Sequence, residues 1–236
     1  MNIELPSTKI LGTAITTAPR DQILEYIFKK LSKRDEKFYI VTPNPEILVK
    51  ASASKDFQKI LNGAAVSLPD GVGVLVAGKM LNKQLKVRIT GVDFMLDLCH
   101  EASKQALSIG LLGGRDGVAE KTAECLIKMY PGLRIVLTAE EFPIGFTPHI
   151  DILFVAYGFP KQEEWIAKNL PDIKVTCAMA VGGAFDYISG KIPRAPKVVR
   201  DLGMEWAFRL TQQPWRAKRQ MALPVFVGKV LKEKFF

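Results

Sequence analysis

Ser-Leu-Pro-Asp-Gly-Val-Gly, residues 67–73, ends the apolar run Ala64–Leu68. The run has the length of a short buried strand, and the Pro and the two Gly are typical of a tight turn that leads into a helix. Asp70 is therefore expected at the carboxyl end of a strand, where open α/β sheets bind their ligands. Its carboxylate could cap the next helix or accept a proton from a substrate, and the local pattern leaves both interpretations open.

Apolar runs and amphipathic stretches alternate on both sides of this turn. Strands are predicted at 37–41, 107–112, 133–138, 150–156 and 175–181, and a first strand or hairpin at 9–16. Helical periodicity is found at 21–31, 45–51, 56–61, 91–106, 118–129 and 161–169. This alternation predicts an α/β fold with a mostly parallel, Rossmann-like sheet and helices on both faces.

The positive charge is concentrated at the end of the chain. Residues 194–236 carry ten Lys or Arg and three Asp or Glu, so they supply +7 of the net charge of +9. A length of 236 residues allows one large domain with an appendage. The expected division is an α/β catalytic domain at 1–193 and a basic C-terminal appendage at 194–236 that docks on a membrane.

Two amphipathic segments make up this tail. Apolar residues recur at helical spacing from Val199 to Leu210 and predict an ordinary packing helix with a solvated basic face. The second segment, after Pro214, mixes aromatic and aliphatic residues with lysines and arginines. Pro224 and Gly228 argue there against a regular core helix, so an anionic membrane surface, which attracts each cation by ~1 kcal/mol, is the favoured partner.

Several features bear on the compartment. Three widely spaced cysteines without a Cys-x-x-Cys pair predict reduced thiols in the cytoplasm. The start of the sequence lacks the basic and apolar regions of a signal peptide. The apolar stretch 150–159 is far shorter than the ~20 residues that cross a bilayer. A soluble or peripheral protein is expected.

Two glycine-rich turns follow predicted strands. Gly113-Gly114, with Gly117, comes before one helix, and Gly182-Gly183 follows the last strand. Such turns bring main-chain N–H groups to a diphosphate at a helix N-terminus. A tight turn explains either one alone equally well, but two of them at strand ends favour a phosphate-bearing ligand.

Other polar residues suggest ligand contacts but no metal centre. Arg88 can bind phosphate through its guanidinium or form a surface ion pair. Lys161 and Gln162 begin a predicted helix with groups suited to nucleotide or sugar hydroxyls, or simply form a helix start. The two histidines, His100 and His149, lie far apart and near no Gly-x-Ser-x-Gly motif, which disfavours a Ser-His-Asp hydrolase. No Asp-x-Asp pair is present, and no metal is expected.

Seven short motifs follow one another along the chain. They are Thr42-Pro43-Asn44-Pro45-Glu46, Leu68–Gly73, Arg88–Asp93, Leu111–Gly114, Gly158–Glu163, Val181–Asp186 and Arg194-Ala195-Pro196. This ordered set resembles the WecG/TagA/CpsF glycosyltransferases (glycosyltransferase family 26) over about residues 10–220.

The resemblance implies an activity. A sugar of the N-acetylmannosamine type would pass from a UDP donor to undecaprenyl-diphosphate-linked N-acetylglucosamine, with inversion and without a bound metal or other cofactor. The product would enter the synthesis of teichoic acid or a surface polysaccharide. The tail would dock on the inner face of the plasma membrane and help close the site, so the expected location is cytoplasmic and peripheral.

The resemblance also implies site residues. Asp70 matches the proposed catalytic base. The implied substrate-binding residues are Thr42, Asn44, Arg88, Gly113, Gly114, Lys161, Gln162, Gly182, Gly183 and Asp186. The implied acceptor or membrane contacts are Arg194, Arg209, Arg216 and Arg219.

Alternatives of two kinds stay open. The donor could be a UDP-linked N-acetylmannosaminuronic acid or another UDP-hexose. Outside this class, an enzyme acting on a soluble nucleotide sugar would not need the basic tail. A nucleic-acid-binding protein could use the tail against phosphates, but the chain lacks a recognisable reading module, so no nucleic-acid partner is expected. The oligomeric state is open, a homo-oligomer included.

Overall fold

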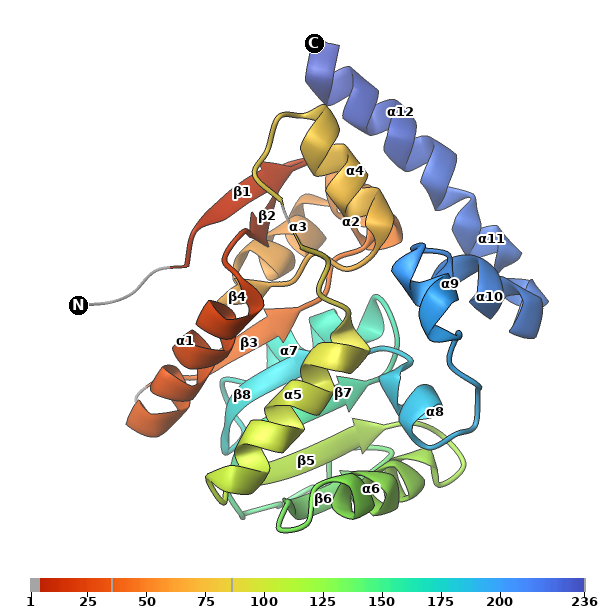
Figure 1. Cartoon of the computed structure of the whole chain (residues 1–236). Coiled ribbons are helices and arrows are strands. Elements are labelled where there is room, and N and C mark those ends of the chain that lie inside the picture. The colour runs from red at the N-terminus through yellow and green to blue at the C-terminus, as the bar shows by residue number, and fades with distance from the viewer. Residues whose placement is uncertain (1–4, 35, 86, 236) are drawn as a thin grey trace.

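A parallel sheet forms the centre of the molecule. The computed structural model describes residues 5–34, 36–85 and 87–235, and within them the sheet has six strands in the order β4-β3-β8-β7-β5-β6 (Figure 1). All neighbouring strands run parallel, which confirms the predicted fold class. The strands are β3 (Phe38–Val41), β4 (Val66–Ser67), β5 (Ser108–Gly113), β6 (Arg134–Ala139), β7 (Ile150–Ala156) and β8 (Val175–Ala180). Residues 1–4, on which the expectation of no signal peptide rests, lie outside the described residues.

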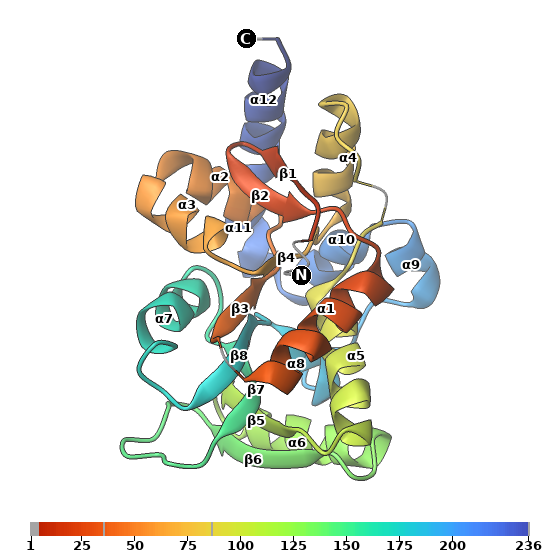
Figure 2. The same ribbon diagram turned by 90° about the vertical axis from the view of Figure 1, so that its left-hand side faces the viewer.

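Helices cover both faces of the sheet (Figure 2). Along β8, Cys177 and Met179 pack into the core on one face, and Ala178 and Ala180 pack into the core on the other. The first face carries α1 (Arg20–Lys33), α5 (Gly91–Lys104), α6 (Val118–Met129) and α8 (Ala184–Ile188). The second carries α2 (Pro45–Ala53), α3 (Lys55–Asn62) and α7 (Lys161–Asn169). Burial of strands on both faces explains their nearly continuous apolar sequences.

An N-terminal hairpin and the last helix pack beside α2 and α4 (Val72–Met80). The predicted hairpin is present as β1 (Ser7–Ile10) and β2 (Thr13–Thr16), which pair antiparallel. The last helix, α12 (Ala222–Phe235), contacts α2 and α4 and buries Phe226 and Val230 (Figure 1). The end of the basic tail is thus part of the core beside the sheet.

The prediction for the first tail segment is wrong. Instead of one packing helix, the chain forms α9 (Lys197–Asp201) and α10 (Glu205–Gln212), separated at Gly203, where φ is +72°. No residue of either helix is buried, and Leu202 and Trp206 are 70% and 45% exposed. The helices are held instead by charged side chains, described below, which face the rest of the protein.

The argument against a regular helix in the second tail segment is also wrong. After η1 (Pro214–Arg216) and α11 (Ala217–Gln220), α12 runs without interruption past Pro224 and Gly228. Pro224 is the third residue of α12, where its missing N–H has no partner to lose. No helix in the described ranges has the length and hydropathy to span a bilayer.

Candidate active site

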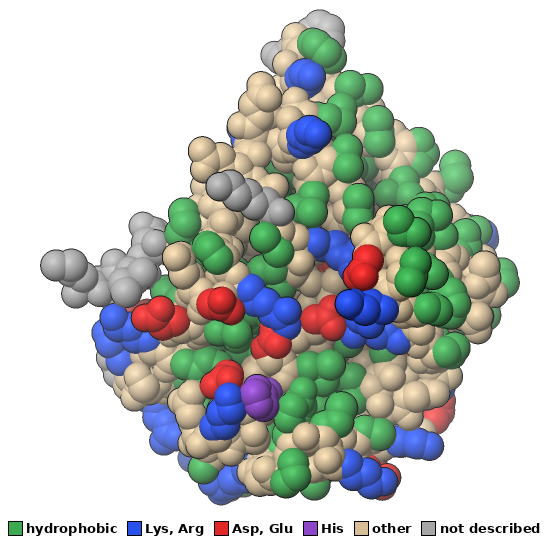
Figure 3. Space-filling model, in the orientation of Figure 1, with side chains coloured by type: hydrophobic (Ala, Val, Ile, Leu, Met, Phe, Trp, Pro, Cys, Tyr) green, Lys and Arg blue, Asp and Glu red, His purple; other side chains and the backbone are tan. Residues whose placement is uncertain are grey.

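A cavity of about 600 Å³ opens where the tail crosses the carboxyl edge of the sheet. Residues that follow β3, β4, β7 and β8 form one side, and residues 202–223 of the tail form the other. These four strands are neighbours in the sheet, so loops far apart in sequence converge on one place. Acidic and basic side chains cluster between α5 and the α9–α10 segment, and hydrophobic side chains cover α9, α10 and α12 (Figure 3).

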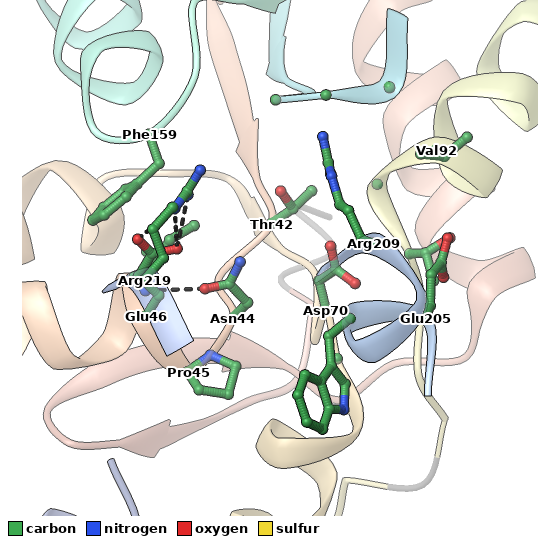
Figure 4. A pocket seen from close by; sticks show the side chains of 18 of the residues that line it. Thr42, Asn44, Pro45, Glu46, Asp70, Val92, Phe159, Glu205, Arg209 and Arg219 are labelled. Atoms are coloured by element: carbon green, nitrogen blue, oxygen red, sulfur yellow. Dashed lines mark hydrogen bonds and ion pairs between the residues drawn. The ribbon is translucent and has the colours of Figure 1, made fainter. Parts of the chain in front are cut away.

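Most of the predicted site residues come together here. Those that line the cavity are Thr42, Asn44, Asp70, Arg88, Gln162, Gly182, Gly183, Asp186, Arg209, Arg216 and Arg219 (Figure 4). Thr42 is buried directly after β3, and its Oγ1 lies 3.5 Å from the Ala180 carbonyl oxygen. Asn44 also caps the start of α2, because its side-chain oxygen accepts a hydrogen bond from the Ile47 N–H at 3.0 Å, which is typical of an N-cap.

Four predicted residues are not part of the lining. Gly113 ends β5 and Gly114 follows it, one strand beyond those that form the cavity. A Cβ on Gly113 would approach the Ala156 backbone to 2.8 Å, so this turn serves close strand packing. Lys161 is exposed at the start of α7. Arg194 lies behind the cavity, in an ion pair with Asp93.

Asp70 faces the cavity and does not cap α4. The N-cap of α4 is Gly71, at φ +92°, and no side chain caps this helix. The Asp70 N–H donates to the Pro43 carbonyl at 3.1 Å, which holds the residue between the ends of β3 and β4. The pKa of Asp70 is raised to about 7, mainly by burial and then by the charge of Glu205, while Arg88 opposes the rise. A carboxyl group with this pKa suits a general base at neutral pH.

This pKa predicts a pH dependence. Only ionised Asp70 accepts a proton, so kcat/KM should rise with pH, level off above about pH 8, and fall about tenfold per unit below about pH 6. Initial rates at subsaturating substrate, measured from acid to alkaline buffer, give the profile. A flat profile, or one that rises toward acid, would remove Asp70 as the base.

Three arginines of the tail reach the cavity. Arg209 lies 3.8 Å from Asp186 and 4.8 Å from the centre of the Tyr187 ring. Gly183 lets it approach, because a Cβ there would collide with the Arg209 guanidinium. Arg219 forms a two-pronged ion pair with Glu46, at 2.8 and 2.7 Å (Figure 4). These contacts join the tail to α8 and α2.

Arg216 differs from the other two. Within the described residues its guanidinium pairs with no carboxylate, and its side-chain hydrogen bond goes to the Gln213 side-chain oxygen, at 3.3 Å. Burial, with the like charges of Arg209 and Arg219, lowers the pKa of Arg216 to about 10. A half-buried cation beside two others is costly unless an anion binds, so this side of the cavity suits a phosphate-bearing ligand.

An ion-pair network fastens α10 next to Asp70. Glu205 lies 3.6 Å from Arg88 and 3.4 Å from Arg194. Arg194 in turn donates two hydrogen bonds to Asp93, at 2.7 and 2.8 Å. Burial works to raise the pKa of Asp93, but the hydrogen bonds from Arg194 and Thr90 bring it down to about 2, so the pair is ionised. Arg88 thus lines the cavity and also takes part in an ion pair.

Sequence reasoning missed several lining residues. Glu46 lies in the motif at 42–46 but is not among the implied substrate-binding residues, and the tail pattern predicts Glu205 and Trp206 only as part of an amphipathic helix. Its membership of this motif is the one available signal for Glu46. Glu205 lies in none of the motifs, and its place in the cavity depends on how the tail packs against the sheet domain. In the described ranges, no three His, Cys, Asp or Glu side chains gather as metal ligands would.

A cavity at the carboxyl edge of a parallel sheet, with one enclosed carboxylate and a cluster of arginines, is typical of α/β enzymes that act on phosphorylated ligands. The model of the glycosyl transferase WecG/TagA/CpsF family matches residues 8–236. The chain belongs to this family.

Curated relatives are similar over nearly the whole chain. Three of them carry the name N-acetylglucosaminyldiphosphoundecaprenol N-acetyl-beta-D-mannosaminyltransferase. The one from Bacillus subtilis (strain 168) is 31% identical, over 89% of this chain and 86% of the relative. That from Bacillus spizizenii is 32% identical, over 83% and 79%. That from Staphylococcus aureus (strain MW2) is 30% identical, over 95% and 92%.

Proposed function

We propose that this glycosyltransferase moves an N-acetylmannosamine unit from a UDP donor to N-acetylglucosamine linked through diphosphate to undecaprenol. The names of the relatives support the sugar and the acceptor. The arginine cluster supports a donor with a diphosphate. Nothing in the family match or in the relatives favours a uronic acid donor, another UDP-hexose or a nucleic-acid partner.

The reaction would be a single displacement with inversion. Asp70 accepts the proton of the acceptor hydroxyl while that oxygen attacks the anomeric carbon of the donor, and the bond from this carbon to UDP breaks. Negative charge then develops on the departing diphosphate. Arg216, beside Arg209 and Arg219, is placed to neutralise this charge, and the main-chain N–H of Gly183, which lines the cavity, would add to it.

The observation that carries this proposal is the presence in one cavity of Asp70 and of Arg216, which has no carboxylate partner in the part of the chain that the structure describes. A donor screen tests it. UDP release is measured with UDP-linked N-acetylmannosamine, N-acetylglucosamine, N-acetylmannosaminuronic acid and glucose, against a lipid-diphosphate N-acetylglucosamine acceptor, with and without chelator. We expect release that requires the acceptor, is fastest with N-acetylmannosamine and persists with chelator. No acceptor-dependent release from any donor would end the proposal.

The membrane partner is part of the same proposal. The division at residues 193 and 194 separates the sheet from a segment whose outer surface is apolar and basic. Exposed apolar side chains along it are Trp215, Met221, Val225, Val227, Leu231 and Phe235. Lys229, Lys232 and Lys234 lie on the same helix, α12. A surface of this kind suits the inner face of the plasma membrane, where a polyprenyl-linked acceptor is held.

Removal of two apolar anchors should weaken vesicle binding. Trp215 and Phe235 are 70% and 67% exposed, so the double variant Trp215→Gln, Phe235→Gln should fold normally and lose at least about tenfold in affinity for anionic vesicles. Co-sedimentation measures this. Ile144→Gln is the control, because Ile144 is fully exposed in the β6–β7 loop. Equal binding of all three proteins would show that the tail is not the anchor.

A further inference from the structure

Glu163 is a buried carboxyl group that the proposed reaction does not use. It is 0% exposed, in the first turn of α7, and burial raises its pKa to about 7. Its Oε2 is buried and has no hydrogen-bond partner in the described residues. A methionine would fill a similar space without the cost of an unsatisfied polar atom, so the carboxyl group needs an explanation.

The other carboxyl oxygen, Oε1, holds the neighbouring side chain. Gln162, 2% exposed, donates a hydrogen bond from Nε2 to Glu163 Oε1 at 2.9 Å. The amide oxygen of Gln162 accepts two further hydrogen bonds, from the Gly158 N–H at 3.2 Å and from the Gly182 N–H at 2.9 Å. An amide has one oxygen and one NH₂ group, so an acceptor at 163 makes the oxygen face the two glycines.

These hydrogen bonds join the two turns beside the cavity. Gly158 follows β7 and Gly182 follows β8, and both line the cavity with Gln162. Both are glycines at positive φ, +76° and +53°. Because glycine has no Cβ, these two residues restrain the backbone of their turns only weakly. The Gln162 amide oxygen is therefore the element that ties one turn to the other.

We propose that Glu163 is a positioning residue: it sets the orientation of the Gln162 amide, which holds the Gly158 and Gly182 turns in the arrangement that receives the donor. Glu163 acts through Gln162 and does not touch the substrate. That these turns receive a UDP-sugar rests on the proposed function; the hydrogen-bonded chain does not.

Two variants distinguish the effect of the acceptor oxygen at position 163 from the effect of the side chain's volume. Glu163→Gln keeps an oxygen for Gln162 Nε2, and Glu163→Met fills the space without one. We expect the Met variant to fold, with donor KM raised between about tenfold and a hundredfold and kcat changed less, because displaced turns weaken donor binding. The Gln variant should stay within about threefold of the parent enzyme. A Met variant with parent kinetics, or a Gln variant as impaired as the Met variant, overturns the proposal.

A double-mutant cycle and amide exchange complete the test. If Glu163 acts through Gln162, then Glu163→Met added to Gln162→Met should change donor KM little further, whereas additive effects would show independent roles. The Gly158 and Gly182 amides should exchange faster in the Met variant, as NMR would record, and unchanged exchange contradicts the inference. The exchange measurement needs no substrate. It therefore tests the role of Glu163 even if the parent enzyme releases no UDP and the proposed function fails.

Discussion

Asp70→Asn is expected to fold and to lose between about 10²-fold and 10⁴-fold in kcat, the range that a general base contributes. The amide has nearly the shape of the carboxylate but cannot accept the proton of the attacking hydroxyl. Steady-state UDP release in the presence of acceptor measures the loss, and calorimetric titration with UDP should show donor affinity close to that of the parent. Near-normal turnover would remove Asp70 from the chemistry.

Thermal unfolding gives a control for this variant. The folded pKa of Asp70, about 7, lies above the ordinary value of 3.8, so between these values the folded chain keeps a proton that the unfolded chain has lost. The contribution of Asp70 to stability is therefore complete below about pH 4 and is lost as the pH rises through about 7. Asp70→Asn should melt at a higher temperature than the parent at pH 8 and at a similar one at pH 4. A lower Tm at pH 8 would indicate damaged packing.

The elements of the sheet domain could be predicted because their signals are local. The sequence pattern predicts α6 at 118–129, β7 at 150–156 and α7 at 161–169, and these are the observed bounds. The start of α2 is equally local, since Asn44 and Pro45 are favoured at the first two positions of a helix. β4, an edge strand, is shorter than its apolar run: it has two residues, Val66 and Ser67, and ends two positions before Pro69.

The tail could not be predicted in the same way, because its structure depends on distant partners. Arg219 pairs with Glu46, 173 positions earlier, and Arg194 pairs with Asp93, 101 positions earlier. Helical spacing shows which residues share a face, but not whether that face meets the core. In α10 the polar residues Glu205 and Arg209 face the protein, and Trp206 stays largely exposed.

The same difference between local signals and long-range contacts applies to the candidate site. Motif residues at the ends of β3, β4 and β8 meet because parallel strands share one edge. Gly113 and Gly114 carry an equally good turn signal, yet β5 lies beyond β7 and its end does not reach the cavity. The order of strands in the sheet, which local sequence does not encode, decides which glycine turn faces the ligand.

Arg216→Ala is expected to lower kcat by between about 10²-fold and 10³-fold, the effect of removing one preorganised group that stabilises developing charge. Arg209 and Arg219 are already paired with Asp186 and Glu46, whereas Arg216 pairs with no carboxylate among the described residues, so its charge is available for a departing diphosphate. Arg216→Lys should recover part of the loss, because an ammonium supplies charge without the planar guanidinium.

The matched control for this variant is Arg134→Ala, the same change at an exposed residue that begins β6, away from the cavity. It should leave kcat and UDP affinity unchanged. The two variants carry the same net charge, so a difference between them reports the position of the charge and not its amount. If both variants lose activity equally, the loss reflects the total positive charge of the protein, which attracts the substrate, and not the position of Arg216. If neither variant loses activity, Arg216 does not stabilise the leaving diphosphate. That result would contradict the role proposed for Arg216 in the reaction.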